Sequence, residues 1–268
     1  MTNIAPLGER SVIAITGLDR VSFLQGLVSN DVTLAAPGKA VWSALLTPQG
    51  RWLADFFILT DGARLLLDCE RDQAAMIVQK LSRFKLRAKV ALELTDWHVA
   101  VAWGGNSDLS DKVLSAPDPR LPDAGYRLLS PEPIEGNAEP ADWQAHRIAL
   151  GLPDGSSDLE PERSLLLEAG FDELNGVSWS KGCYMGQELT ARTRYRGLVK
   201  KRLLPVRGNG PLQAGKILDG DQEVGEVRSV AGNHGLAFVR LDHLNGTLMA
   251  AGQGINVAMP DWVRIKSS

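Results

Sequence analysis

Short apolar runs bounded by turn residues occupy the N-terminal part of the chain, and this pattern restricts the fold to strands with interspersed helices. The runs with the length of strands lie at residues 12–15, 40–46, 52–59, 64–68, 89–94 and 98–103. Turn sequences at 47–50 and 61–62 are typical of hairpins. We therefore expect a small sheet with one or more helices packed against it.

Helical periodicity is found in a few separate segments. The strongest spans residues 71–84, where apolar side chains recur at helical spacing. Asp19 suits the N-cap position of a helix that carries apolar residues from Val21 to Val28 on one face. A further helix is expected over 140–150, with Gly151 placed to end it. The intervening stretch, 104–140, is rich in Gly, Pro, Asp and Ser and reads as connecting structure with one short strand at 126–129.

Composition excludes several classes of protein. The 268 residues are 44% hydrophobic and 23% charged, which is typical of a soluble globular chain and not of a disordered one. No run approaches the roughly 18 unbroken apolar residues of a membrane span, and residues 1–10 lack the features of an export signal. Two cysteines cannot build a disulfide framework or, alone, a zinc site. We therefore expect a reduced, cytoplasmic protein with no membrane partner.

The segment Lys181-Gly-Cys-Tyr-Met-Gly-Gln-Glu188 concentrates reactive and conformationally special residues. Two glycines bracket Cys183, which predicts a tight turn that presents the thiol. Eight basic residues and one acid lie between Lys181 and Arg207, in a chain whose net charge is −3. Cations near the sulfur would favour the thiolate, and the segment suits an anionic ligand. Two alternatives stay open: Cys183 as a small buried hydrophobe, and the basic run as a solvated face.

Other catalytic patterns are absent from the sequence. The four histidines, at positions 98, 146, 234 and 243, lie outside any recognisable catalytic motif, which argues against a cysteine hydrolase. The chain has no P-loop, dinucleotide-binding glycine pattern, zinc-protease motif or nucleophile elbow. Cys69 ends an apolar strand-like run and is expected to be structural. The net charge gives no case for bulk binding to nucleic acid, so no stable nucleic-acid partner is expected.

The motif at 181–188 resembles the signature K-G-C-Y-x-G-Q-E of the YgfZ-type folate-binding proteins, bacterial and mitochondrial factors for iron–sulfur protein maturation. Residues 190–192 and 195–197 extend the resemblance beyond the signature. Further similarity lies at 15–31, 46–51, 147–153 and 167–170, so it covers most of the chain. That family is related to the glycine-cleavage T protein, an aminomethyltransferase that uses tetrahydrofolate.

The resemblance implies an α+β fold with three subdomains in a ring around a central folate cleft, ending in a small antiparallel β-barrel. Residues 1–46, completed by 125–197, would form the first folate-binding subdomain. Residues 47–124 would form a ferredoxin-like α+β subdomain, and 198–268 the barrel. The last region independently shows short Val, Ile and Leu runs broken by glycines, which is typical of a small barrel.

The resemblance also assigns folate-binding residues. Glu168 falls where the T protein has a glutamate that binds the pterin ring, a task suited to a carboxylate that accepts several N–H bonds. Trp143 resembles an aromatic position at the folate cleft and would stack on the ring, although a core tryptophan is the alternative. Arg194 and Arg196 would meet the glutamate tail of folate. The remaining cofactor-binding candidates belong to the signature: Tyr184, Gln187 and Glu188.

The candidate reactive groups are the thiol of Cys183, Lys181 and Asp55, and no metal-ligand set is expected. The strand after the hairpin turn departs from the T-protein pattern: paired acids there are replaced by Ala54-Asp55. A single carboxylate at a place tied to amine transfer lowers the expectation of glycine cleavage.

These observations predict a tetrahydrofolate-binding accessory protein that supports assembly or repair of iron–sulfur proteins, rather than an enzyme in the usual sense. Cys183 would make a transient contact with sulfur, a metal or a mixed disulfide. Because iron–sulfur clusters generally take about four protein ligands, a transient cluster would be shared with a partner or a second subunit. The expected partners are folate and iron–sulfur assembly or client proteins. The alternatives are a tetrahydrofolate-dependent aminomethyl transferase, with Asp55 orienting folate, and RNA binding through residues 192–202.

Overall fold

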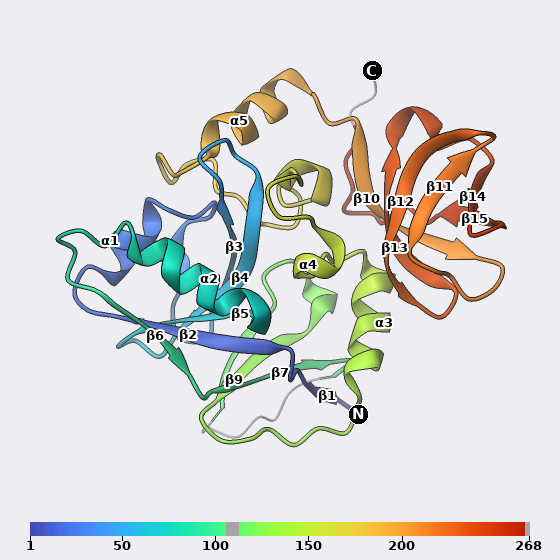
Figure 1. The fold of residues 1–268 in the computed structure, drawn as a ribbon. Helices are drawn as coiled ribbons and strands as arrows, with labels where there is room; N and C mark the ends of the chain where they lie inside the picture. Colours follow the sequence, from blue (N-terminus) through green and yellow to red (C-terminus); the bar gives the residue numbers. More distant parts are fainter. Residues whose placement is uncertain (106–112, 266–268) are drawn as a thin grey trace.

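The computed structural model describes residues 1–105 and 113–265, whose strands form two open sheets and a closed barrel (Figure 1). Residues 106–112 of the expected second subdomain and 266–268 of the expected barrel lie outside the described residues. Within the described ranges, no helix is both long and apolar enough to span a membrane.

The first sheet is antiparallel, with strands in the order β3-β4-β5-β2-β6. Its members are β2 (Arg10–Thr16), β3 (Val41–Leu46), β4 (Trp52–Thr60), β5 (Leu65–Glu70) and β6 (Ala91–Thr95). Successive residues of a strand point to opposite faces, so β4 serves two cores. Phe56 packs with one apolar cluster, which includes Ile77 of α2 (Arg71–Ser82), and Phe57 packs with another, which includes Trp143. Burial on both faces explains the continuous apolar runs in the sequence.

The second sheet has the order β1-β7-β9-β8 and packs beside α3 (Pro140–Leu150). Its strands are β1 (Asn3–Pro6), β7 (His98–Trp103), β9 (Tyr126–Ser130) and β8 (Leu114–Pro117). The sequence did not predict β1 and β8, because four-residue edge strands carry too few side chains to show a period. β6 and β7 follow each other in the chain but belong to different sheets, where a single small sheet was expected.

The C-terminal strands confirm the expected barrel. They close in the order β10-β13-β12-β11-β14-β15 and enclose an apolar core that includes Val206, Ile217 and Val239. The strands are β10 (Lys201–Gly208), β11 (Gly215–Asp219), β12 (Gln222–Ala231), β13 (His234–Arg240), β14 (Leu248–Ala250) and β15 (Gln253–Val257).

The helices agree with the sequence in part. Helix α3 ends at Gly151, whose φ of 78° is left-handed, as predicted. Helix α1 (Arg20–Gln25) follows Asp19, but that side chain accepts a hydrogen bond from the backbone N–H of Lys89 (2.7 Å) instead of capping the helix. Helix α5 (Gln187–Arg196) was not predicted, because its buried residues are Thr190 and Thr193 rather than apolar ones. The shorter elements are α4 (Gly155–Asp158), η1 (Val32–Leu34), η2 (Pro122–Ala124), η3 (Leu166–Ala169) and η4 (Leu241–His243).

The predicted division into subdomains stays a prediction, and strand pairing bears on its first boundary. The boundary between residues 46 and 47 lies inside the β3–β4 hairpin. Strands β2 and β3 of the first expected subdomain therefore share a sheet with β4, β5 and β6 of the second.

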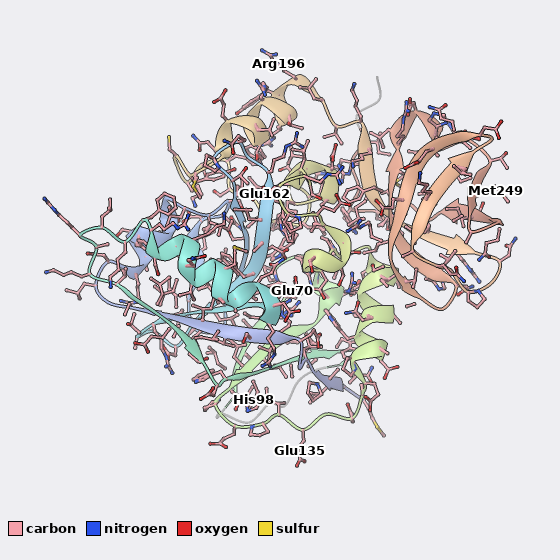
Figure 2. The ribbon with its side chains drawn as sticks, viewed as in Figure 1. Glu70, His98, Glu135, Glu162, Arg196 and Met249 are labelled. Carbon is pink, nitrogen blue, oxygen red and sulfur yellow. The ribbon has the colours of Figure 1, made fainter. Side chains whose placement is uncertain are left out.

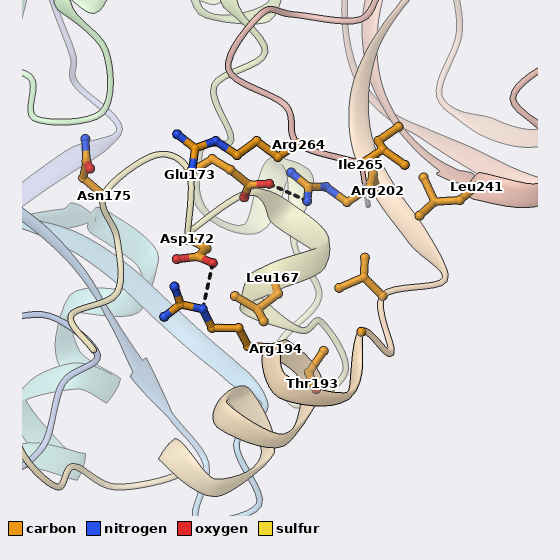
Figure 3. A pocket seen from close by; sticks show the side chains of 12 residues that line it. Leu167, Asp172, Glu173, Asn175, Thr193, Arg194, Arg202, Leu241, Arg264 and Ile265 are labelled. Carbon is orange, nitrogen blue, oxygen red and sulfur yellow. Dashed lines mark hydrogen bonds and ion pairs between the residues drawn. The ribbon is translucent and has the colours of Figure 1, made fainter. Parts of the chain in front are cut away.

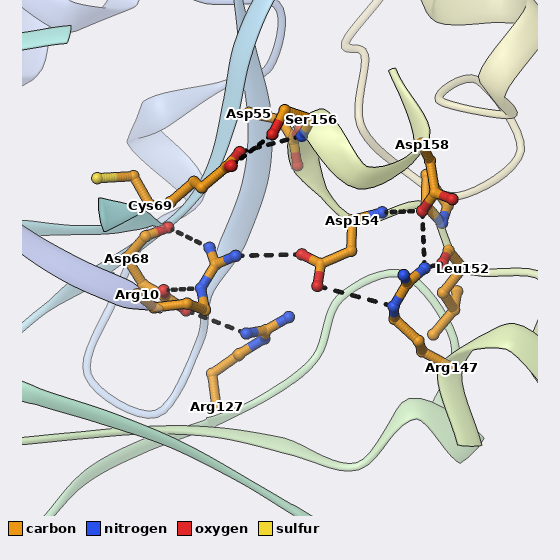
Figure 4. A network of polar contacts seen from close by, with 12 residues as sticks. Arg10, Asp55, Asp68, Cys69, Arg127, Arg147, Leu152, Asp154, Ser156 and Asp158 are labelled. Atoms are coloured by element: carbon orange, nitrogen blue, oxygen red, sulfur yellow. Dashed lines mark hydrogen bonds and ion pairs between the residues drawn. The ribbon is translucent and has the colours of Figure 1, made fainter. Parts of the chain in front are cut away.

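A buried set of ion pairs, here called the ion-pair network, joins the two sheets to the segment that follows α3 (Figure 4). Within the described residues it contains four arginines and four aspartates: Arg10, Arg120, Arg127, Arg147, Asp68, Asp118, Asp154 and Asp158. The formal charges balance, as burial requires.

Asp68 on β5 is the centre of one half of the network. It contacts Arg10 on β2 and accepts from Arg127 Nη1 on β9 (3.2 Å), so it bridges the two sheets. Arg10 Nη1 reaches Asp154 at 3.1 Å, and Arg147 of α3 reaches Asp158 at 2.7 Å. Asp158 also accepts from Ser229 on β12, which ties the barrel to the same network.

Replacement of Asp68 by Asn should destabilise the protein, because two buried guanidinium groups would share too little negative charge. Unpaired buried charges cost about 3–5 kcal/mol, and we expect a loss of that order in the free energy of unfolding from urea titration. The control is Asp242→Asn, which removes an exposed partner of Arg240. Equal losses in both variants would contradict a special role for the network.

Candidate functional site

The two cysteines lie in opposite environments. Cys183 is exposed in the turn before α5, whereas Cys69 is buried on β5. Burial raises the pKa of the Cys69 thiol to about 12, which suits a structural residue. The alternative that Cys183 is a small buried hydrophobe is therefore wrong.

The turn that carries Cys183, residues 181–186, is called the thiol turn here, and it is fixed on both sides of the cysteine. Lys181 Nζ donates to the backbone oxygens of Val28 and Asn30, each at 2.6 Å. On the other side, the N–H of Met185 donates to the oxygen of Gly26 at 3.2 Å. The chain just after α1 therefore holds the turn, while the thiol stays open to solvent.

The side chain of Lys181 contacts backbone carbonyls and the ring of Tyr184. Two of its three donors are taken by carbonyls, and its ammonium lies 5.3 Å from the ring centre of Tyr184. Burial lowers the pKa of Lys181 to about 8, against the opposing charge of Asp31. The expectation that neighbouring cations favour the thiolate of Cys183 stays a prediction.

The hairpin turn at 47–50 packs directly on the thiol turn. A Cβ atom at Gly186 (φ 82°) would lie 2.5 Å from the backbone oxygen of Thr47. A Cβ atom at Gly50 (φ 82°) would lie 2.6 Å from the oxygen of Gly186. Two motifs that are far apart in the sequence are thus in backbone contact, which only glycine permits.

The remaining signature residues shape the start of α5. Tyr184 is buried, and this burial raises the pKa of its phenol to about 12. The side-chain oxygen of Gln187 accepts from the N–H of Tyr184 at 3.1 Å. Glu188 is exposed in the first turn of α5, and Arg196 lies at the outer end of that helix, pointing away from the protein (Figure 2). Tyr184 and Gln187 therefore have structural contacts, and their predicted role toward folate stays a prediction.

A pocket of about 490 Å³ lies between α5, the segment after η3 and the first barrel strand (Figure 3). Its charged lining is Asp172, Glu173, Arg194, Arg202 and Arg264. Arg194 Nε lies 3.6 Å from Asp172, and its guanidinium is 4.0 Å from the ring of Trp179. Arg202, which is buried, donates to Glu173 at 2.8 Å.

Three cations of the basic run have acidic partners within the protein, whereas Arg192, Arg196, Lys200 and Arg207 are exposed residues. Arg194, Lys201 and Arg202 face Asp172, Glu168 and Glu173, respectively. The alternative of a solvated basic face does not hold for buried Arg202, but it fits the exposed cations of the run. A count of charges along the chain missed the pairing, because each acid precedes its partner by 22 to 33 positions.

Glu168 lies at the edge of this region, in η3, which packs against α5. Burial raises the pKa of its carboxyl, opposed by Lys201, whose Nζ is 3.9 Å away, and by Arg51. The structure thus brings Glu168 and Arg194 to the same region, as a folate site requires. Asp172, Glu173 and Arg202 were missed by sequence reasoning, and the cluster of acids after Glu168 was the available signal.

Trp143 and Asp55 do not join that region. Trp143 on α3 is 1% exposed and lies among Trp103, His146 and Arg127, with ring or guanidinium distances of 5.6–5.7 Å. Its faces are covered, so the core alternative fits it better than stacking on a pterin. The role of Glu168 and Arg194 toward folate stays a prediction.

Asp55 is enclosed by tryptophans. Its two carboxylate oxygens accept from Trp42 Nε1 (2.9 Å) and Trp52 Nε1 (3.1 Å), and the side chain is buried. Burial raises the pKa of Asp55 to about 6, although these hydrogen bonds act in the opposite direction. Asp55 thus holds two core rings in place, and its burial keeps the carboxylate away from solvent.

Because the pKa of Asp55 rises from 3.8 to about 6 on folding, the folded protein binds the proton more tightly. The stabilisation is complete below pH 4 and is lost as the pH rises through 6. We expect the stability of wild type relative to Asp55→Asn to fall by on the order of 3 kcal/mol across that window. The measurement is denaturant unfolding at a series of pH values.

The control for this series is Asp242→Asn, because the hydrogen bond from exposed Arg240 lowers the pKa of Asp242. The stability of wild type relative to Asp242→Asn should rise, rather than fall, as the pH increases. A flat difference for Asp55→Asn would show that Asp55 keeps its ordinary pKa in the folded protein.

Comparisons with known proteins show which family the chain resembles. Residues 200–265 match the family described as CAF17, C-terminal beta-barrel domain. The chain is 33% identical over 298 residues to the human protein named iron-sulfur cluster assembly factor IBA57, mitochondrial, covering 96% of this chain and 84% of that protein. It is 39% identical over 227 residues to the IBA57 homolog of Mycosarcoma maydis, covering 76% of this chain but only 56% of that protein.

A solved structure confirms the predicted fold. The aminomethyltransferase T of the glycine cleavage system from Bartonella henselae matches with a TM-score of 0.78 at 14% identity, covering 98% of this chain and 86% of that one. At this identity the likeness concerns the fold alone.

The comparisons also correct one expectation. The prediction of a cytoplasmic location is wrong on this finding, because the human and fungal relatives are both named as mitochondrial proteins. The identity to the human protein over most of both chains settles the family. The chain belongs to the IBA57 family of iron–sulfur cluster assembly factors and has the fold of the aminomethyltransferase T protein.

Proposed function

We propose that this protein supports the assembly or repair of iron–sulfur proteins through the thiol of Cys183. The observation that carries the proposal is an exposed cysteine in a turn whose backbone is anchored on both sides. Anchoring by Lys181 and Met185 fixes where the sulfur is presented, and exposure leaves it accessible to a second protein. The names of the relatives supply the process in which such a thiol would act.

The thiol of Cys183 would be one ligand among several. Among the described residues, no three His, Cys, Asp or Glu side chains lie close enough to hold a metal ion together. Since a cluster generally takes about four protein ligands, the others would come from an assembly or client protein. A shared, transient cluster therefore suits the geometry better than a resident one.

Replacement of Cys183 by Ser should abolish the function while leaving the fold intact, because the side chain is exposed and the turn is held by its neighbours. In cells that depend on this protein, we expect the activity of iron–sulfur enzymes to fall to the level of the deletion. Circular dichroism and the unfolding midpoint should stay at their wild-type values.

The matched control is Cys69→Ala, which removes the other thiol from the core. It should cost some stability, typically ~1 kcal/mol, and keep iron–sulfur enzyme activity. Full activity in Cys183→Ser would rule out the proposed role of the thiol.

Binding of tetrahydrofolate, the finer property expected of a YgfZ-type protein, stays a prediction. Its support is the pocket beside α5, whose volume of about 490 Å³ is within the range of small-molecule sites. Arg194, which lines the pocket, would pair with a carboxylate, and Glu168, which follows the lining residue Leu167, would accept from a heterocycle. The aminomethyl-transferase alternative has less support, because both oxygens of Asp55 are engaged by tryptophans.

Isothermal titration with tetrahydrofolate tests this prediction directly. We expect wild type to bind and Arg194→Ala to bind about tenfold more weakly, since a charge-assisted hydrogen bond contributes ~1.5–3 kcal/mol. Arg240→Ala, on the barrel surface, is the control and should bind as wild type does. Absence of binding by wild type would remove folate from the proposal and leave the role of Cys183 untouched.

A further inference from the structure

A groove with several apolar side chains in its lining is formed by α1 and the loop that connects α2 to β6. The two segments that form it are seen in Figure 1. We call it the α1 groove, and its volume is about 410 Å³. It is lined by residues of both segments: Asp19, Ser22, Phe23, Gly26, Leu27, Phe84, Lys85, Leu86, Arg87 and Ala88.

The apolar side chains of the connecting loop are unusually accessible. Leu86 is 90% exposed and Phe84 is 43% exposed. Leu86 also has a φ of 40°, a left-handed backbone that leucine rarely adopts, so the loop holds it outward at a cost in free energy. Grouped apolar side chains at the surface mark interaction sites more often than isolated ones do.

The charges of the same loop alternate with these apolar residues. Residues 83–89 read Arg-Phe-Lys-Leu-Arg-Ala-Lys, and their four basic side chains belong to exposed residues. The acid that lines the groove is Asp19, whose carboxylate accepts the backbone N–H of Lys89. The α1 groove therefore combines apolar and basic side chains in its lining, which favours an occupant with apolar side chains flanked by acids.

The groove and the thiol turn are built on the same stretch of chain. Gly26 lines the groove, and its backbone oxygen accepts the N–H of Met185, two residues after Cys183. Met185 and Phe23 pack against the same apolar core. Gly26 therefore belongs both to the lining of the α1 groove and to the backbone anchor of the thiol turn.

We propose that the α1 groove docks an acidic amphipathic segment of the protein that exchanges its cargo with Cys183. The identity of that protein rests on the proposed function, whereas the binding chemistry rests on the groove alone. A membrane surface is the less favoured occupant, because a groove that borders a thiol turn suits a folded partner better than a lipid layer.

The first experiment measures binding of a fluorescein-labelled helical peptide by anisotropy. In the probe, leucines recur at helical spacing and glutamates fill the other positions, and a scrambled peptide has the same composition. Wild type should prefer the patterned peptide, and affinity should fall with added salt. Lys85→Glu combined with Arg87→Glu, and Phe84→Ser combined with Leu86→Ser, should each weaken binding about tenfold.

The matched control lies on the barrel, where a groove is lined by Lys216, Leu218 and Met249. Lys216→Glu combined with Leu218→Ser should bind the peptide as wild type does. Equal affinity for patterned and scrambled peptides, or equal binding by wild type and the α1-groove variants, would overturn the proposal.

The second experiment separates this proposal from the proposed function. Cys183→Ser should bind the peptide normally and lose iron–sulfur enzyme activity in cells. The α1-groove variants should lose both, while their Cys183 still reacts with a thiol reagent at the wild-type rate. If Cys183→Ser stays active, the proposed function fails and docking stands. If the groove variants stay active and bind peptide, docking fails and the function stands.

The same variants also test two other occupants of the α1 groove. Self-association of wild type in sedimentation, lost on Phe84→Ser with Leu86→Ser, would assign the groove to a second copy of this chain. Binding to phosphatidylcholine vesicles that contain phosphatidylserine, lost in the charge-reversed variant without any peptide preference, would assign it to lipid. Either result would overturn docking of a protein segment.

Discussion

The buried ion-pair network is the constraint on which the arrangement of the two sheets and the barrel depends. Charges placed in a protein interior are tolerated only when partners are correctly positioned. Asp68 ties β2 to β9, and Asp158 ties α3 to the barrel. A shift of either sheet would separate charges that have no water to solvate them. The network therefore specifies one arrangement of the parts more strongly than apolar contacts would.

The same network decides where a ligand or partner has room. Arg127 lies 3.8 Å from the ring of Phe57 and 5.6 Å from that of Trp143, so guanidinium and aromatic groups fill the middle of the molecule. Asp55 is held among Trp42 and Trp52 in the same interior. The groups that a ligand or partner can reach therefore lie at the surface, in the thiol turn, the pocket beside α5 and the α1 groove.

Local signals in the sequence predicted what depends on local structure. Hairpin turns, apolar periodicity and Gly151 located most strands, the helices α2 and α3, and the barrel. The turn around Cys183 followed from its two glycines. The features that the sequence did not predict depend on contacts between residues far apart in the chain, such as Arg194 with Asp172. The interior position of Asp55 likewise depends on two tryptophans whose orientation no local pattern reveals, and α5 lacks the apolar stripe that would have marked it.

The contact of Gly50 with Gly186 joins the β3–β4 hairpin to the thiol turn without any side chain between them. Because the contact is between backbone atoms, no side chain can change its rotamer to accommodate a movement of the hairpin relative to the turn. The position of the turn that carries Cys183 is therefore tied to the first sheet through this hairpin, as well as to the start of α5 through Gln187.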